Sequence, residues 1–170
     1  MERLERILGT DHPDTLSASS ELAVNYLHQG QLEEAERLNL EVLGIRRRVL
    51  GLEHPDTLVT AGDLAKVYAD QGRSEEAEGL ESEVLQQKRR ILGLEHPETI
   101  WSAVNLANIC MNQERYEAAE EWLAPAVKLS IKVMGQNHPN TQSRVKTLVD
   151  VYNKLGRLEE AGETEKLLLP

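Results

Sequence analysis

Apolar and polar positions along the chain follow the spacing of helices, in pairs of consecutive segments. In residues 14–29, Leu22 and Tyr26 lie on one helical stripe, and Gly30 then ends the segment. A second segment, residues 32–50, opens with glutamates and closes with arginines, which suits the dipole at both ends of a helix. No segment alternates in the way that predicts a strand. The pattern therefore predicts antiparallel helix pairs.

The helix pair returns every 42 residues without a gap. This step relates prolines, leucines and alanines: Pro13, Pro55, Pro97 and Pro139; Leu22, Leu64, Leu106 and Leu148; Ala35, Ala77, Ala119 and Ala161. Self-similarity at such a period indicates a solenoid. We expect an all-α solenoid forming a single domain over residues 1–170. Its repeats are 9–50, 51–92, 93–134 and a truncated 135–170, and residues 1–8 match the end of a preceding second helix.

The connector between helix pairs carries a repeated Gly, His-Pro and Thr, as in GLEHPDTL from Gly51 to Leu58. Gly51 is expected to end one helix and Pro55 to begin the next, where a proline N–H would have no helical partner. His54 falls near the N-cap, where a ring nitrogen can accept a backbone N–H. A zinc site would need ligands within ~2 Å of one ion. Histidines a repeat apart are separated by ~10 Å, so the pattern predicts caps and no metal.

Composition and charge narrow the class of protein. The formal net charge is −10, which argues against a nucleic-acid partner. No apolar run approaches the ~20 residues of a membrane helix, and no signal-peptide core is present. The one cysteine, Cys110, stands where other repeats carry tyrosine, so we expect a buried thiol in a reducing compartment. Motifs of enzymes are absent. These features predict a soluble cytoplasmic protein that is not an enzyme and has no cofactor.

The repeat resembles a known family. Leu64-Ala65, Tyr68 and Gly72, followed by Glu75-Glu76-Ala77-Glu78, are similar to the tetratricopeptide repeat (TPR). The unit exceeds the usual ~34 residues by about 8, as in kinesin-light-chain-like repeats. The block LGLEHPDT and the ending Lys88–Gly93 are most similar to the repeats of fungal NB-ARC/STAND (NLR-like) receptors. The resemblance implies a right-handed superhelix whose concave face is lined by the first helices, and a protein-binding function.

The sequence departs from the kinesin light chain pattern at two positions. That pattern has an asparagine before the Leu-Ala pair, and only Asn105 matches it. It also has an aromatic residue four positions after the alanine of the second helix, where this chain has Asn39, Glu81, Leu123 and Glu165. In addition, Pro125 is expected to bend the second helix of the third repeat or to shift its start.

The concave groove is the candidate binding site. By family analogy it is lined by Asp63 and Lys66 in repeat 2, Trp101, Asn105, Asn108, Met111 and Asn112 in repeat 3, and Lys146 and Asp150 in repeat 4. Trp101 and the three asparagines are spaced by four, three and four residues, so they share one helical stripe. Asparagine can pair with the backbone of an extended peptide, and tryptophan is a frequent hot-spot residue. Alternatively, Trp101 packs on the adjacent repeat and the asparagines are merely solvated.

Three functions remain open at this stage. The leading one is a groove that binds a protein or peptide, as the recognition region of a larger NLR-like receptor. The second is a scaffold that self-associates end to end, because the chain begins and ends within a repeat without a polar cap. The third is a kinesin-light-chain-like cargo adaptor. The basic clusters 46–48 and 88–90 are interpreted as partners of helix termini and nearby acids rather than anion sites, and Trp122 is assigned to the core.

Overall fold

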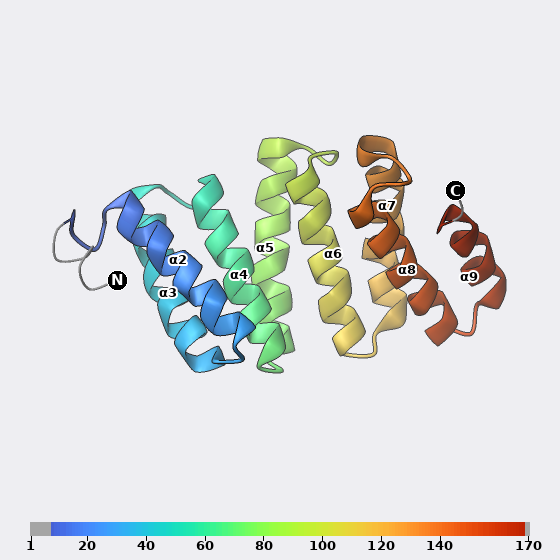
Figure 1. Cartoon of the computed structure of the whole chain (residues 1–170), viewed down its shortest axis with the longest axis horizontal. Coiled ribbons are helices and arrows are strands. Elements are labelled where there is room, and N and C mark those ends of the chain that lie inside the picture. The colour runs from blue at the N-terminus through green and yellow to red at the C-terminus, as the bar shows by residue number, and fades with distance from the viewer. Residues whose placement is uncertain (1–7, 169–170) are drawn as a thin grey trace. The chain divides into compact units, whose positions relative to one another are not determined.

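The computed structural model describes residues 8–168, which are helical apart from short connectors (Figure 1). The helices are α2 (Pro13–His28), α3 (Leu32–Val49), α4 (Pro55–Asp70), α5 (Ser74–Leu92), α6 (Pro97–Asn112), α7 (Tyr116–Met134), α8 (Pro139–Lys154) and α9 (Leu158–Glu165), with a final 3₁₀ turn η1 (Lys166–Leu168). No strand occurs among these described residues. The predicted all-α class is confirmed. The match of residues 1–7 to a preceding helix lies outside the described residues.

The chain divides into two compact units, Met1–Gln87 and Lys88–Pro170. In the first unit α2 packs on α3 and α3 on α4, which is the order expected of consecutive antiparallel pairs. A hydrophobic cluster joins the two repeats of this unit through Leu43, Leu58, Ala61, Leu64 and Val84. The second unit repeats the arrangement, with α6 on α7, α7 on α8 and α8 on α9.

The four connectors build the same helix start. His12, His54, His96 and His138 are the N-cap residues of α2, α4, α6 and α8, and a proline follows each of them. In every case the histidine Nδ1 accepts a hydrogen bond from the backbone N–H two residues on, at 3.2 Å. The repeated His-Pro is therefore a cap, as the spacing predicted, and its recurrence along the chain follows from the helix start that each repeat needs.

Pro125 does not shift the helix that contains it. α7 begins at Tyr116, 42 residues after the first residue of α5, Ser74, and continues through Pro125 to Met134. The expectation of a displaced start is wrong, and the alternative, a bend of the helix at Pro125, stays a prediction. Pro125 is exposed, so water can satisfy the carbonyl group that loses its N–H partner.

Trp122 is only partly buried, so its assignment to the core is wrong. The Cζ atom of Arg89 lies 5.4 Å from the centroid of the Trp122 ring. The indole packs under a guanidinium that remains exposed, which is a cation–π arrangement near the surface. The thiol of Cys110, by contrast, is fully buried, as predicted.

Candidate functional site

The candidate stripe lies on the one open face of α6. Between Thr99 and Cys110 every residue of this helix is buried except Trp101, Asn105 and Asn108. Trp101 is 51% exposed. Protein therefore covers α6 on its other faces and leaves these side chains available.

The chemistry of the stripe is polar but uncharged. Asn108 and Asn112 are exposed, Met111 is half-buried at the same end, and Trp101 provides the largest apolar surface at the other. Asn105 is half-buried and already has a partner within the protein. Asn108 and Asn112 offer both donors and acceptors, which suits the main chain of an extended peptide better than a charged ligand.

The remaining candidates belong to the first helices of repeats 2 and 4. Lys146 and Asp150 are exposed and lie one turn apart on α8, in the same unit as α6. Lys66 is exposed and Asp63 half-buried on α4, in the other unit, and Asp63 has an interaction partner. All nine predicted residues thus keep accessible surface, but their joint role in one groove stays a prediction.

Two basic residues in the clusters at the ends of the second helices turn inward. Arg46 is 5% exposed, and its Nη1 donates to the carbonyl oxygen of Asp56 at 3.1 Å and to Thr60 Oγ1 at 2.5 Å. Lys88 is also buried and forms an ion pair of 3.1 Å with Glu98. These cations hold successive helices together.

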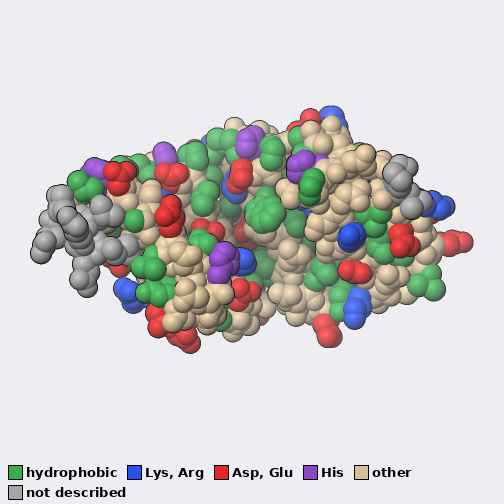
Figure 2. Space-filling view, viewed as in Figure 1, with side chains coloured by type: hydrophobic (Ala, Val, Ile, Leu, Met, Phe, Trp, Pro, Cys, Tyr) green, Lys and Arg blue, Asp and Glu red, His purple; other side chains and the backbone are tan. Residues whose placement is uncertain are grey.

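Other cations of these helix ends pair at the surface. Arg48 lies 2.7 Å from Asp11, and Lys132 pairs with Glu95. The interpretation of the clusters as partners of nearby acids is confirmed for Arg48 with Asp11 and for Lys88 with Glu98, whereas Lys132 lies outside both clusters. Figure 2 shows Lys and Arg side chains scattered singly over the face that it presents, among acidic and hydrophobic ones.

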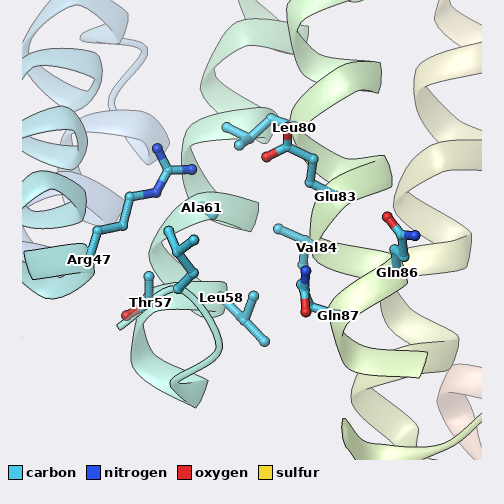
Figure 3. A pocket seen from close by; sticks show the side chains of 10 residues that line it. Arg47, Thr57, Leu58, Ala61, Leu80, Glu83, Val84, Gln86 and Gln87 are labelled. Carbon is cyan, nitrogen blue, oxygen red and sulfur yellow. The ribbon is translucent and has the colours of Figure 1, made fainter. Parts of the chain in front are cut away.

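The structure also contains a cavity that the sequence analysis missed. It has a volume of about 350 Å³ and lies in the first unit between the end of α3, the start of α4 and the middle of α5 (Figure 3). Leu58, Ala61 and Val84 form apolar walls, and Arg47 and Glu83 stand at its edge. None of the nine residues predicted to bind a partner lines this cavity. The sequence does contain one sign of this cavity. At the repeat position where the third repeat has the large side chain of Trp122, the second repeat has the smaller Leu80.

The described part of the chain was searched for metal-binding clusters and for membrane-spanning helices. Within residues 8–168, no group of three or more His, Cys, Asp or Glu side chains is placed to hold a metal ion. None of the helices described is long and apolar enough to cross a membrane.

Comparisons with known proteins identify the family. Two family models, each described as tetratricopeptide repeat, match residues 14–90 and 99–140, which together make up more than half of the chain. The chain belongs to the tetratricopeptide repeat family. No curated protein matches it.

Solved structures agree with this fold. The nearly identical TPR-like repeats from Podosopora anserina, described as a kinesin light chain, are 29% identical to this chain, with a TM-score of 0.80. That match covers 98% of this chain and 79% of the other. BtubC (BKLC) from P. vanneervenii is 20% identical over 92% of this chain and 64% of its own, with a TM-score of 0.82. A Rap protein complexed with competence and sporulation factor is 17% identical, with a TM-score of 0.83, over 99% of this chain and 45% of its own. The last two similarities show the fold alone.

Proposed function

We propose that this protein interaction module binds an extended peptide segment of a partner along the open face of α6. The observation that carries the proposal is the exposure pattern of that helix. Trp101, Asn105 and Asn108 are its only accessible residues between positions 99 and 110. A large apolar side chain beside amide side chains gives a partner both buried area and main-chain hydrogen bonds. Lys146 and Asp150 on α8 would contact charged side chains of the same segment.

A displayed library of random 12-residue peptides tests this proposal directly. We expect the wild-type chain to enrich a family of peptides that a triple variant, Trp101→Ala, Asn108→Ala and Asn112→Ala, does not retain. The matched control replaces three exposed residues of α7 by alanine: Glu117, Glu121 and Lys128. The control should retain the peptides, and circular dichroism should show all three proteins equally helical. Peptides retained equally by the triple variant would place the binding site elsewhere.

The wider role suggested for this binding is recognition within a larger receptor of the NB-ARC/STAND type. The same surface would serve a cargo adaptor of the kinesin light chain type, a role that the similarity to the kinesin light chain repeats supports only through the fold. The two roles differ in the partner domain. In the receptor role, this chain should change the nucleotide exchange rate of an NB-ARC nucleotide-binding domain with which it is coexpressed. In the cargo-adaptor role, that exchange rate should stay the same.

A self-associating scaffold remains a second candidate because of exposed apolar residues. Val49 at the end of α3 is 51% exposed, and Leu52 in the connector after it is 63% exposed. Leu94 is 57% exposed in the corresponding connector of the second unit, and Leu158 is 71% exposed. Exposed apolar surface of this kind often marks an interface. A molar mass that rises with concentration in light scattering would favour the scaffold, and a constant monomer mass would contradict it.

A further inference from the structure

The repeat period provides an internal template for the cavity of the first unit. The position of Leu80 on α5 corresponds to Trp122 on α7, and Arg47 at the end of α3 corresponds to Arg89. In the second unit the guanidinium of Arg89 covers the Trp122 ring, with its Cζ 5.4 Å from the ring centroid. The first unit has the arginine but a leucine at the position of the tryptophan, and both residues line the cavity of about 350 Å³.

The walls of this cavity fit an indole. Leu58, Ala61, Leu80 and Val84 supply apolar surface, and three of them are part of the buried cluster that joins the two repeats. The volume is within the range of ~300–1,000 Å³ typical of small-molecule pockets, so it is large enough for a single aromatic ring. An aromatic ring placed there would bury a large area against side chains that already have fixed positions.

The charged groups at the edge are available to the occupant. Neither Arg47 nor Glu83 forms a hydrogen bond or ion pair within the described residues. Figure 3 shows the Arg47 guanidinium and the Glu83 carboxylate directed toward one another over Ala61. Arg47 can stack on the face of a ring, and the Glu83 carboxylate can accept the indole N–H, which needs a partner when buried.

We infer that this cavity is a docking pocket for a tryptophan side chain presented by a protein partner. The pocket is separate from the stripe on α6, since all its residues lie in the first unit, and the inference is independent of the proposed peptide groove. The partner supplies in trans the ring that the third repeat carries as Trp122. Phenylalanine fits the walls but leaves Glu83 without a donor, so tryptophan is preferred.

The test uses N-acetyl-tryptophanamide, which represents tryptophan within a polypeptide, and observes the methyl groups of Leu58, Leu80 and Val84 by NMR. We expect saturable ring-current shifts of these methyl signals, with a Kd on the order of 1 mM for a fragment of this size. N-acetyl-phenylalaninamide should bind severalfold more weakly. Absence of shifts at millimolar concentrations, or equal binding of the two amides, would overturn the inference. Tighter binding of free tryptophan would indicate a small-molecule site and would also overturn it.

A variant whose own side chain fills the cavity provides a second test of the inference. Leu80→Trp reproduces the third repeat, so we expect Arg47 to stack on the new ring, the melting temperature to rise and binding of the amide to weaken at least tenfold. Leu40→Trp makes the same change at an exposed position of α3 that does not line the cavity, and it should leave binding unchanged. Undiminished binding to a folded Leu80→Trp variant would show that the amide binds elsewhere.

Discussion

Glu114 occupies a backbone position that the other repeats give to glycine. Its φ is 58°, whereas Gly30, Gly72 and Gly156 have φ values of 73°, 77° and 73° at the corresponding position. Each of these residues follows the end of a first helix and allows the chain to turn into the second. A side chain in the left-handed region costs roughly 1 kcal/mol relative to glycine. The third repeat therefore carries local strain at this turn.

Replacing Glu114 by glycine should stabilise the protein. We expect Glu114→Gly to raise the free energy of unfolding by about 1 kcal/mol, because glycine adopts this conformation without a steric penalty. Urea denaturation followed by circular dichroism measures the change. The reverse substitution, Gly30→Glu, is the control and should destabilise by a similar amount, since nothing lies within 4 Å of the added Cβ to complicate the effect. A Glu114→Gly variant of unchanged or lower stability would contradict the strain.

Among the helices, a buried cation joins a second helix to the following first helix in both units, but its location changes. Arg46 on α3 donates to Thr60 on α4, 14 residues later. The corresponding positions on α7 and α8 hold the opposite arrangement, because Arg144 Nη1 donates to Ser130 Oγ at 2.7 Å. Arg144 is 5% exposed, and this burial lowers the pKa of its guanidinium. Both units therefore pair one guanidinium with one hydroxyl group. In the first unit the guanidinium is on the second helix of the pair in contact, and in the second unit it is on the following first helix.

This exchange predicts the outcome of a double-mutant cycle on α7 and α8. Ser130→Arg alone places two guanidinium groups in one buried site, and Arg144→Ser alone leaves the site underfilled. Each should lower the free energy of unfolding by ~2 kcal/mol or more. The double variant recreates the Arg46–Thr60 arrangement, and we expect a favourable coupling energy of ~1–3 kcal/mol. Additive losses in chemical denaturation would show that the two positions do not interact as a pair.

Across the molecule as a whole, ion pairs recur with the repeat and link adjacent repeats. Arg73, after the end of α4, contacts Glu36 on α3 at 2.6 Å and Glu76 on α5 at 2.6 Å. In the second unit Arg157 contacts Glu120 and Glu160 in the same way, at 2.5 and 2.8 Å. In both units the arginine also lies over a tyrosine ring, Tyr68 or Tyr152. We call this arrangement of one arginine, two glutamates and a tyrosine the arginine clamp. In both units it joins the turn after a first helix to the preceding second helix.

The arginine clamp gives a pH dependence of stability. The hydrogen bond from Arg73, with a smaller contribution from Gln71, lowers the pKa of the Glu36 carboxyl below its ordinary value of 4.5. A carboxyl whose pKa is depressed in the folded state stabilises above its unfolded pKa, and this stability is lost as the pH falls through the folded pKa. Glu36→Gln should therefore lower the free energy of unfolding by about 1 kcal/mol at pH 7.

The difference between Glu36→Gln and wild type should shrink as the pH falls below 4.5, because the wild-type carboxylate then becomes protonated. Thermal melts across this range measure it. Glu121→Gln changes an exposed glutamate of α7 that lies beyond the first turn, and it serves as the control, which should follow the wild type at every pH. A Glu36→Gln difference that is constant from pH 7 to pH 3 would exclude the carboxylate as its source.

Local signals along the chain specify the helices of this protein. The 42-residue period, the His-Pro cap and the glycine at the end of each helix pair act through steric limits and hydrogen bonds within a few residues. Helix boundaries could therefore be predicted to within one or two residues, as for α2 and α3. The same helical spacing placed Trp101, Asn105 and Asn108 on one stripe before any contact was known.

The burial of polar side chains and the places where packing is incomplete depend instead on how the helices meet. Arg46 and Arg144 look like surface arginines in the sequence, yet both lie between helices with a hydroxyl partner. The cavity beside Leu80 likewise arises from the shapes of three helices together. Packing of this kind depends on distances between segments far apart in the sequence. Local propensity carries no record of those distances, so the burial of these arginines and the presence of the cavity depend on the tertiary structure of each unit.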